Sequence, residues 1–152
     1  GPRRPYRTHA SADGFEIRVG KSAADNDVLS LDRELCRADD WWLHASGCPG
    51  SHIVVRVPDG DDASSGGAAA GALPRETLLD ACALAVAHSK AGKAALRSKM
   101  PVPVSLTRGR CVSKVPGAPA GQVRLSQCET VNACADVERL RRLGSPAVDP
   151  QS

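Results

Sequence analysis

The chain has 152 residues, a formal net charge of +3 and a hydrophobic content of 41%. These values are typical of a globular protein that buries a sizeable core without disulfides or metal, and they exclude a disordered chain. No apolar run approaches the roughly 20 residues of a membrane-spanning helix, so we expect no membrane partner.

The first twelve residues are basic and contain two prolines, which predicts a flexible basic lead-in over 1–12. Gly1-Pro2 is typical of the scar that tag removal leaves, so the sequence can lack a natural targeting segment. The Asp13-Gly14 turn and the alternation of FEIRVGK then predict a strand over 15–21. Residues 22–35 predict a short helix that begins at an Asp or Asn cap.

Two strands are predicted at WWLHA (41–45) and HIVVRV (52–57), joined through the turn sequence CPGS. The Gly-, Ala- and Asp-rich residues 58–73 predict a mobile loop. Pro74 is well placed to open a helix over 75–93, whose many alanines allow it to lie close against a sheet.

Three later segments are strand candidates, separated by Gly or Pro turns: 101–107, 110–115 and 121–127. A short amphipathic helix is predicted over 135–144. We therefore expect one domain over 13–134, followed by a short helix and tail over 135–152. The predicted fold class is α+β, an antiparallel-rich sheet with one main helix packed on a face, plus short helices.

The positive charge is distributed unevenly along the chain. Between Ala81 and Cys128 there is no Asp or Glu, and the basic residues of this segment are Lys90, Lys93, Arg97, Lys99, Arg108, Arg110, Lys114 and Arg124. Charge of one sign suits a polyanion such as nucleic acid. A solvated basic face is the alternative interpretation.

Side-chain alternation divides the DWWLHA segment into two faces. Leu43 and its neighbours two residues away would lie in the core, whereas Asp40, Trp42 and His44 would share the other face. An indole for stacking, an imidazole and an acid that orients it are the composition of a binding site. In the next strand, His52 and Arg56 would extend this face. The alternative is that Trp42 belongs to the core and His44 is a satisfied polar residue.

Metal and catalytic chemistry are poorly supported by the spacing. His44, Cys48 and His52 offer three candidate zinc ligands where a structural site needs four. Ser51 lacks a nucleophile elbow and an oxyanion loop. The six cysteines form no CxxC pair, which predicts reduced thiols in an intracellular compartment. We expect neither an enzyme nor a bound cofactor.

Four sequence blocks, in this order, resemble the NFACT-R domain of ribosome-quality-control proteins: YRTHASADGFEIRVGKSAADND, DWWLHASGCPGSHIVVR, ETLLDACALAVAHSKA and VSKVPGAPAGQV. They extend from about Tyr6 to Val131. The residues that carry the resemblance are Asp13, Gly14, Ile17, Val19, Gly20, Asn26, Asp27, Asp40, Trp42, Leu43, His44, Pro49, Gly50, Ser51, His52, Ser89, Lys90, Lys114 and Gly121.

The resemblance implies RNA binding, with tRNA, ribosomal RNA and the large ribosomal subunit as expected partners. The chain would be a stand-alone binder or an excised C-terminal domain, working in the cytoplasm or a plastid. The candidate RNA-contacting residues are Arg18, Lys21, Asp40, Trp42, His44, Ser51, His52, Arg56, Lys90, Lys93, Arg110 and Lys114. Two alternatives remain open: a protein-interaction adaptor that docks through 135–144, and a general DNA and RNA binder.

Overall fold

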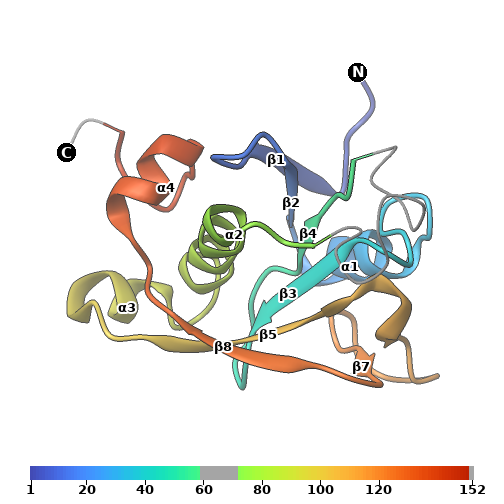
Figure 1. Ribbon diagram of the computed structural model, residues 1–152. Helices are drawn as coiled ribbons and strands as arrows, with labels where there is room; N and C mark the ends of the chain where they lie inside the picture. Colours follow the sequence, from blue (N-terminus) through green and yellow to red (C-terminus); the bar gives the residue numbers. More distant parts are fainter. Residues whose placement is uncertain (59–71, 151–152) are drawn as a thin grey trace.

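The computed structural model describes residues 1–58 and 72–150, and its main feature is a six-stranded antiparallel sheet (Figure 1). The strands lie in the order β1-β2-β4-β3-β5-β8. Their bounds are β1 Tyr6–Ala10, β2 Glu16–Gly20, β4 Ile53–Val55, β3 Trp41–Ala45, β5 Val102–Arg108 and β8 Glu129–Ala133. A separate two-stranded ribbon pairs β6 (Val112–Ser113) with β7 (Arg124–Leu125).

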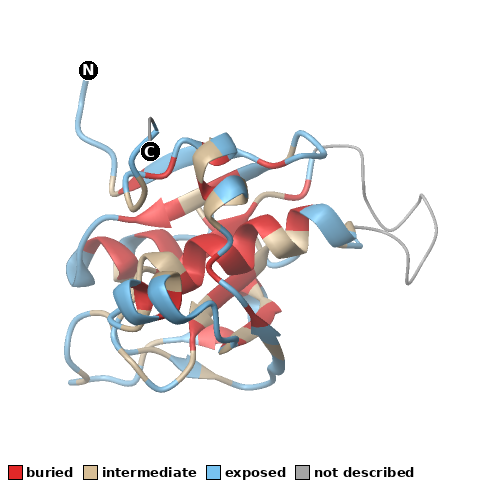
Figure 2. Cartoon of the chain, turned by 90° about the vertical axis from the view of Figure 1, so that its left-hand side faces the viewer, coloured by how far each residue is buried: buried red, intermediate tan, exposed pale blue. Residues whose placement is uncertain are grey.

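One face of the sheet packs against α2 (Arg75–Ala87), which contacts β2, β3, β4, β5 and β8. The side of α2 that faces the sheet carries small side chains, and every residue from Ala81 to Val86 is buried (Figure 2). Alanine allows the helix to approach the strands closely. The predicted α+β fold with one main helix across a face is therefore confirmed.

The opposite face is also covered. The helix α1 (Ala23–Leu31) contacts β1, β2 and β6, and a second buried cluster forms between these elements and the sheet. This cluster contains Tyr6, Leu29, Trp42 and Val54. Alternation in β3 thus places Trp42 and Leu43 on opposite faces as predicted, but both faces are core.

The sequence did not indicate the two edge strands. Residues 6–10 form β1, paired with β2 from Tyr6↔Gly20 to Ala10↔Glu16, where a flexible lead-in was expected. Tyr6 is buried, and the Arg18 guanidinium carbon lies 4.6 Å from the centre of its ring. Most other side chains of β1 and β8 are exposed, so neither segment shows a clear apolar alternation. The loop predicted at 58–73 lies, apart from its ends, outside the described residues.

The helix predicted over 75–93 is interrupted. α2 ends at Ala87, and a second helix, α3 (Gly92–Ser98), follows. Between them Ser89 forms an isolated antiparallel bridge with Gly50. The break therefore brings the Ser89-Lys90 pair to the turn between β3 and β4.

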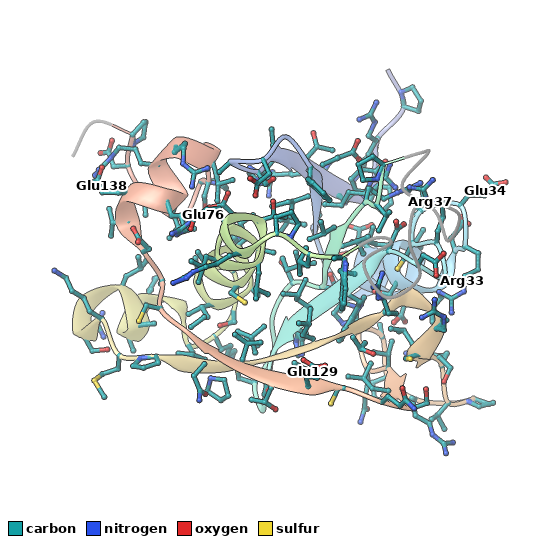
Figure 3. All side chains as sticks on the ribbon, viewed as in Figure 1. Arg33, Glu34, Arg37, Glu76, Glu129 and Glu138 are labelled. Carbon is teal, nitrogen blue, oxygen red and sulfur yellow. The ribbon has the colours of Figure 1, made fainter. Side chains whose placement is uncertain are left out.

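The helix α4 (Val137–Leu143) is part of the same core rather than an appendage. Leu140 and Leu143 are buried against the α2 side of the sheet. Asp80 of α2, with no exposed surface, accepts hydrogen bonds from the guanidinium groups of Arg139 and Arg142 at 2.6–3.0 Å. Figure 3 shows Glu76 and Glu138 at this α2–α4 corner. No helix in the described ranges has the length and apolar character needed to cross a membrane.

Candidate nucleic-acid interface

The turn between β3 and β4 is hydrogen-bonded to the segment that follows α2. The Ser51 N–H donates to the His88 carbonyl at 3.0 Å, and the Lys90 N–H donates to the Pro49 carbonyl at 2.9 Å. Gly50 lies between these bonds, where a Cβ atom would come within 2.8 Å of the Ser89 Cβ. The close approach therefore requires glycine, and it fixes Lys90 beside the turn.

Asn26 of α1 holds the other side of the same turn. Its Oδ1 accepts the His52 N–H at 3.0 Å, and its Nδ2 donates to the Gly50 carbonyl at 3.2 Å. The Ser51 hydroxyl donates to the Gly20 carbonyl at 2.8 Å. A Cβ on Gly20 would lie 1.9 Å from the Asn26 Oδ1, so β2 must end in glycine for this side chain to fit.

A buried chain of hydrogen bonds runs beneath the turn. The Trp42 indole donates to the Ser30 hydroxyl at 2.8 Å, the Ser30 hydroxyl lies 2.6 Å from the His52 Nδ1, and the His52 Nε2 lies 3.0 Å from the Gly121 carbonyl. An indole can only donate, so Ser30 passes its own hydrogen to Nδ1, and Nε2–H donates to Gly121. Burial, together with the nearby His44, lowers the pKa of His52 to about 4, so the ring is neutral at physiological pH.

The loop after β6 is held by one acid and one lysine. The Lys114 ammonium donates to the Asp27 carboxylate at 3.0 Å and to the carbonyls of Pro119 and Gln122 at 2.6 and 2.9 Å. The Gly121 N–H donates to the other Asp27 oxygen at 3.1 Å. An ammonium has three N–H groups, and here each has an acceptor. Lys114 therefore holds the loop instead of reaching outward for phosphate as predicted.

These bonded segments enclose a pocket of about 710 Å³. Trp42 and His52 lie at its base, and the half-buried His44 lines it. The centres of the His44 and His52 rings are 5.3 Å apart. Burial lowers the pKa of His44, although a hydrogen bond to the Gly50 carbonyl partly opposes this effect. Exposed Lys21 and Gln122 also line the pocket.

Three of the predicted contact residues, Asp40, Trp42 and His52, are buried in the fold. Trp42 is 1% exposed and supports the turn, which was the alternative interpretation of its pattern. Asp40 does not orient His44 as predicted. Its carboxylate, with no exposed surface, accepts the backbone N–H groups of Arg37 and Val57 at 2.8 Å and pairs with Arg56 at 3.1 Å.

The predicted cations separate into committed and available groups. Arg56 is bound to Asp40, and Arg18 donates to Glu16 and to the Leu35 carbonyl, so both stabilise the fold. Arg110 is exposed but forms an ion pair with Asp39.

The available group consists of three exposed lysines, Lys21, Lys90 and Lys93. Within residues 1–58 and 72–150, no side-chain hydrogen bond or ion pair occupies any of them.

Sequence reasoning assigned no role in the pocket to three residues that build it, Asn26, Asp27 and Gln122. Asn26 and Asp27 were placed in a helix, and no pattern in the sequence indicated that their side chains would hold two separate loops. Gln122 lies in a segment predicted as a strand, and its carbonyl is held by Lys114, which is paired with Asp27. Across the described ranges, no group of three His, Cys, Asp or Glu side chains is placed to hold a metal ion.

The fold and this lysine-flanked pocket define a small α+β binding module. Residues 5–127 match the family described as NFACT protein RNA binding domain, so the chain belongs to that family, as its motifs predicted. It is 31% identical over 136 residues to the Rqc2 homolog RqcH of Bacillus subtilis (strain 168), covering 90% of this chain and 20% of that relative. The chain thus spans about one fifth of that protein's length.

A solved structure shares the fold. The C-terminal part of the fibronectin/fibrinogen-binding protein from Streptococcus suis superposes with a TM-score of 0.75 and 23% sequence identity. The match covers 94% of this chain and 50% of that one.

We expect Gly20→Ala to lower the free energy of unfolding by about 2 kcal/mol, because the new methyl group overlaps the Asn26 side chain. Urea denaturation of the two single variants and the double variant Gly20→Ala/Asn26→Ala tests the cause. If the overlap is responsible, adding Gly20→Ala to Asn26→Ala costs much less than adding it to the wild type. Equal costs in both backgrounds would contradict this explanation.

We also expect the free energy of unfolding to fall as the pH drops from about 6.5 to about 4. The unfolded chain binds a proton at the ordinary histidine pKa, whereas folded His52 binds one only near its lowered pKa. The loss attributable to His52 is on the order of 3 kcal/mol. Urea denaturation across this range should show a smaller fall in a His52→Gln variant, and parallel profiles would refute the assignment.

Proposed function

We propose that this chain binds tRNA or ribosomal RNA and acts in ribosome-associated quality control. Membership of the NFACT RNA-binding family supports the RNA, and the similarity to the Rqc2 homolog RqcH supports the process. Binding rather than catalysis is the expected activity. We place it in the cytoplasm or a plastid, as the resemblance to ribosome-quality-control proteins implies.

The observation that carries this proposal is the position of the three available lysines. Lys21 lines the pocket, and Lys90 is fixed beside it by its backbone bond to Pro49. Lys93 lies one helical turn further along, in α3. These ammonium groups form no ion pair within the described residues, so an incoming phosphate has no internal partner to displace. They can therefore neutralise phosphates and release counterions.

The arrangement of the acids agrees with this assignment. The pocket lining contains no Asp or Glu among the described residues. Glu76 and Glu138 lie at the α2–α4 corner (Figure 3). Glu76 is in the first turn of α2, whereas Lys90 follows the last turn. The lining of the pocket therefore offers a polyanion one lysine and no carboxylate among the described residues.

The remaining predicted residues take supporting roles in this proposal. Ser51 and His52 set the shape of the turn through their bonds to Gly20, Asn26 and Gly121. The residues that stabilise the surrounding fold through their internal contacts are Asp40, Trp42, Arg18, Arg56 and Lys114. Arg110 offers a weaker contact, because a phosphate would have to compete with Asp39.

Two other functions are kept as outcomes of the test. In the adaptor hypothesis, 135–144 docks on a protein, but the leucines of α4, Leu140 and Leu143, are already buried within the domain. In the second, the chain binds DNA and RNA without preference. Equal affinity for tRNA, duplex DNA and heparin would favour that function.

We expect tRNA binding, measured by fluorescence anisotropy, to weaken steeply between about 50 and about 200 mM salt. Lys21→Ala, Lys90→Ala and Lys93→Ala should each weaken binding and reduce the slope of log affinity against log salt by about 1.

Arg75→Ala is the matched control, because it removes a positive charge from the opposite end of α2. Its affinity and slope should stay close to those of the wild type. Affinity for tRNA that does not change with salt would overturn the proposal. A complex with a cellular partner that survives nuclease treatment and is lost in the Glu138→Ala variant would overturn it in favour of a protein partner.

A further inference from the structure

We infer that the pocket beside His44 receives one unpaired base of the RNA, so that the ligand presents an unstacked nucleotide rather than a continuous duplex. This inference rests on the proposed RNA binding and assigns the part of the RNA that the pocket takes. Three observations support it: the residues that line the pocket, the position and charge of the His44 ring, and the polar side chains of the lining that have no hydrogen-bond partner within the described residues.

The lining suits a flat, partly apolar group. The pocket holds about 710 Å³, and its apolar lining includes Pro49, Pro119, Val123 and Leu125. Lys21 is the only charged side chain among the described residues that line it. A phosphate inside would lose its hydration with one cation to compensate, at a high cost in free energy. The base therefore suits the interior, and the phosphates suit the lysines outside.

His44 supplies the surface on which a base can stack. Its ring lies 6.0 Å from the Trp42 ring and 5.3 Å from the His52 ring, both of which are buried and hydrogen-bonded. The rings beneath it therefore fix its position. Because burial lowers its pKa, the imidazole is neutral at physiological pH and presents an uncharged aromatic face. Stacking on such faces is how proteins commonly bind unpaired bases.

The polar groups of the lining are divided between the fold and a ligand. The hydroxyls of Ser51 and Ser105 are bonded to Gly20 and to Ser46, and the Gly121 carbonyl is bonded to His52. The Gln122 amide and the Cys48 thiol have no hydrogen-bond partner in the described part of the chain. An amide can both donate to and accept from the edge of a base, so Gln122 is placed to bind it.

The walls of the pocket are fixed by the internal contacts of the chain. Asp27 and Lys114 hold the wall formed by 119–123, and Asn26 holds the turn opposite. A pocket held in this way loses little conformational entropy when a base enters.

The test compares a labelled RNA hairpin that has an unpaired loop with a blunt duplex of equal charge. We expect His44→Ala to weaken hairpin binding roughly tenfold, within the range for stacking one base, and to leave duplex binding unchanged. His44→Phe keeps a flat ring and should retain most of the affinity. The salt slope should stay at its wild-type value in both variants, because no phosphate contact is removed.

His9→Ala is the matched control, since His9 lies in β1 and does not line this pocket. A second measurement uses the unmodified protein. Cys48 lines the pocket, whereas the exposed Cys128 and Cys134 do not, so the hairpin should slow alkylation of Cys48 selectively. Mass spectrometry gives the three rates in one experiment.

The two proposals fail in different ways. If neither RNA binds, the proposed function is wrong. If the hairpin binds with the expected salt dependence but Cys48 stays fully reactive and His44→Ala has no effect, RNA binding stands and the base-binding pocket is refuted. Equal binding of hairpin and duplex by the wild type would refute it as well.

Discussion

The candidate site depends on the two hydrogen bonds of the Ser30 hydroxyl. It accepts the only N–H of the Trp42 indole and gives its own hydrogen to His52, whose other nitrogen binds the Gly121 carbonyl. The helix α1, the strand β3, the turn before β4 and a distant loop are joined through this network. Because Ser30 and His52 are almost completely buried, losing one partner would leave polar groups without water or a replacement. These buried groups therefore hold one another in place beneath the pocket.

A second constraint concerns the cations, whose chemical type does not reveal their role. Arg56 and Lys114 are joined to Asp40 and Asp27, which they compensate, so their charges serve the fold. Lys21 and Lys90 lie at the surface, where water hydrates them and a phosphate can reach them. The difference follows from desolvation: a buried carboxylate requires a cation beside it, whereas an exposed lysine does not require an anion.

The motifs that carry the family resemblance are far apart in the chain and close together in space. Gly20, Asn26, the Pro49–His52 turn and the Ser89-Lys90 pair come from four separate segments, yet each is bonded to another of them. Two of the glycines are needed because backbone or side-chain atoms occupy the space of a Cβ. These contacts hold the Pro49–His52 turn, which lines the pocket.

Local patterns in the sequence determined most of the architecture. The alternation of 15–21 and 41–45 and the alanine-rich helix after Pro74 were sufficient to predict the strands β2 and β3, the helix α2 and the α+β class, because side-chain periodicity is a local property. The edge strands β1 and β8 could not be predicted in this way, since side chains at an exposed edge need not alternate.

Only the tertiary structure decided whether Trp42 and the basic residues are bound within the fold or available to a ligand. Whether an indole stacks on RNA or fills a core depends on what covers the second face of the sheet, and here α1 and the β6–β7 ribbon cover it. Whether a lysine is free depends on which acids the fold brings within reach, and contacts between residues as far apart as Asp27 and Lys114 are not encoded in any local pattern.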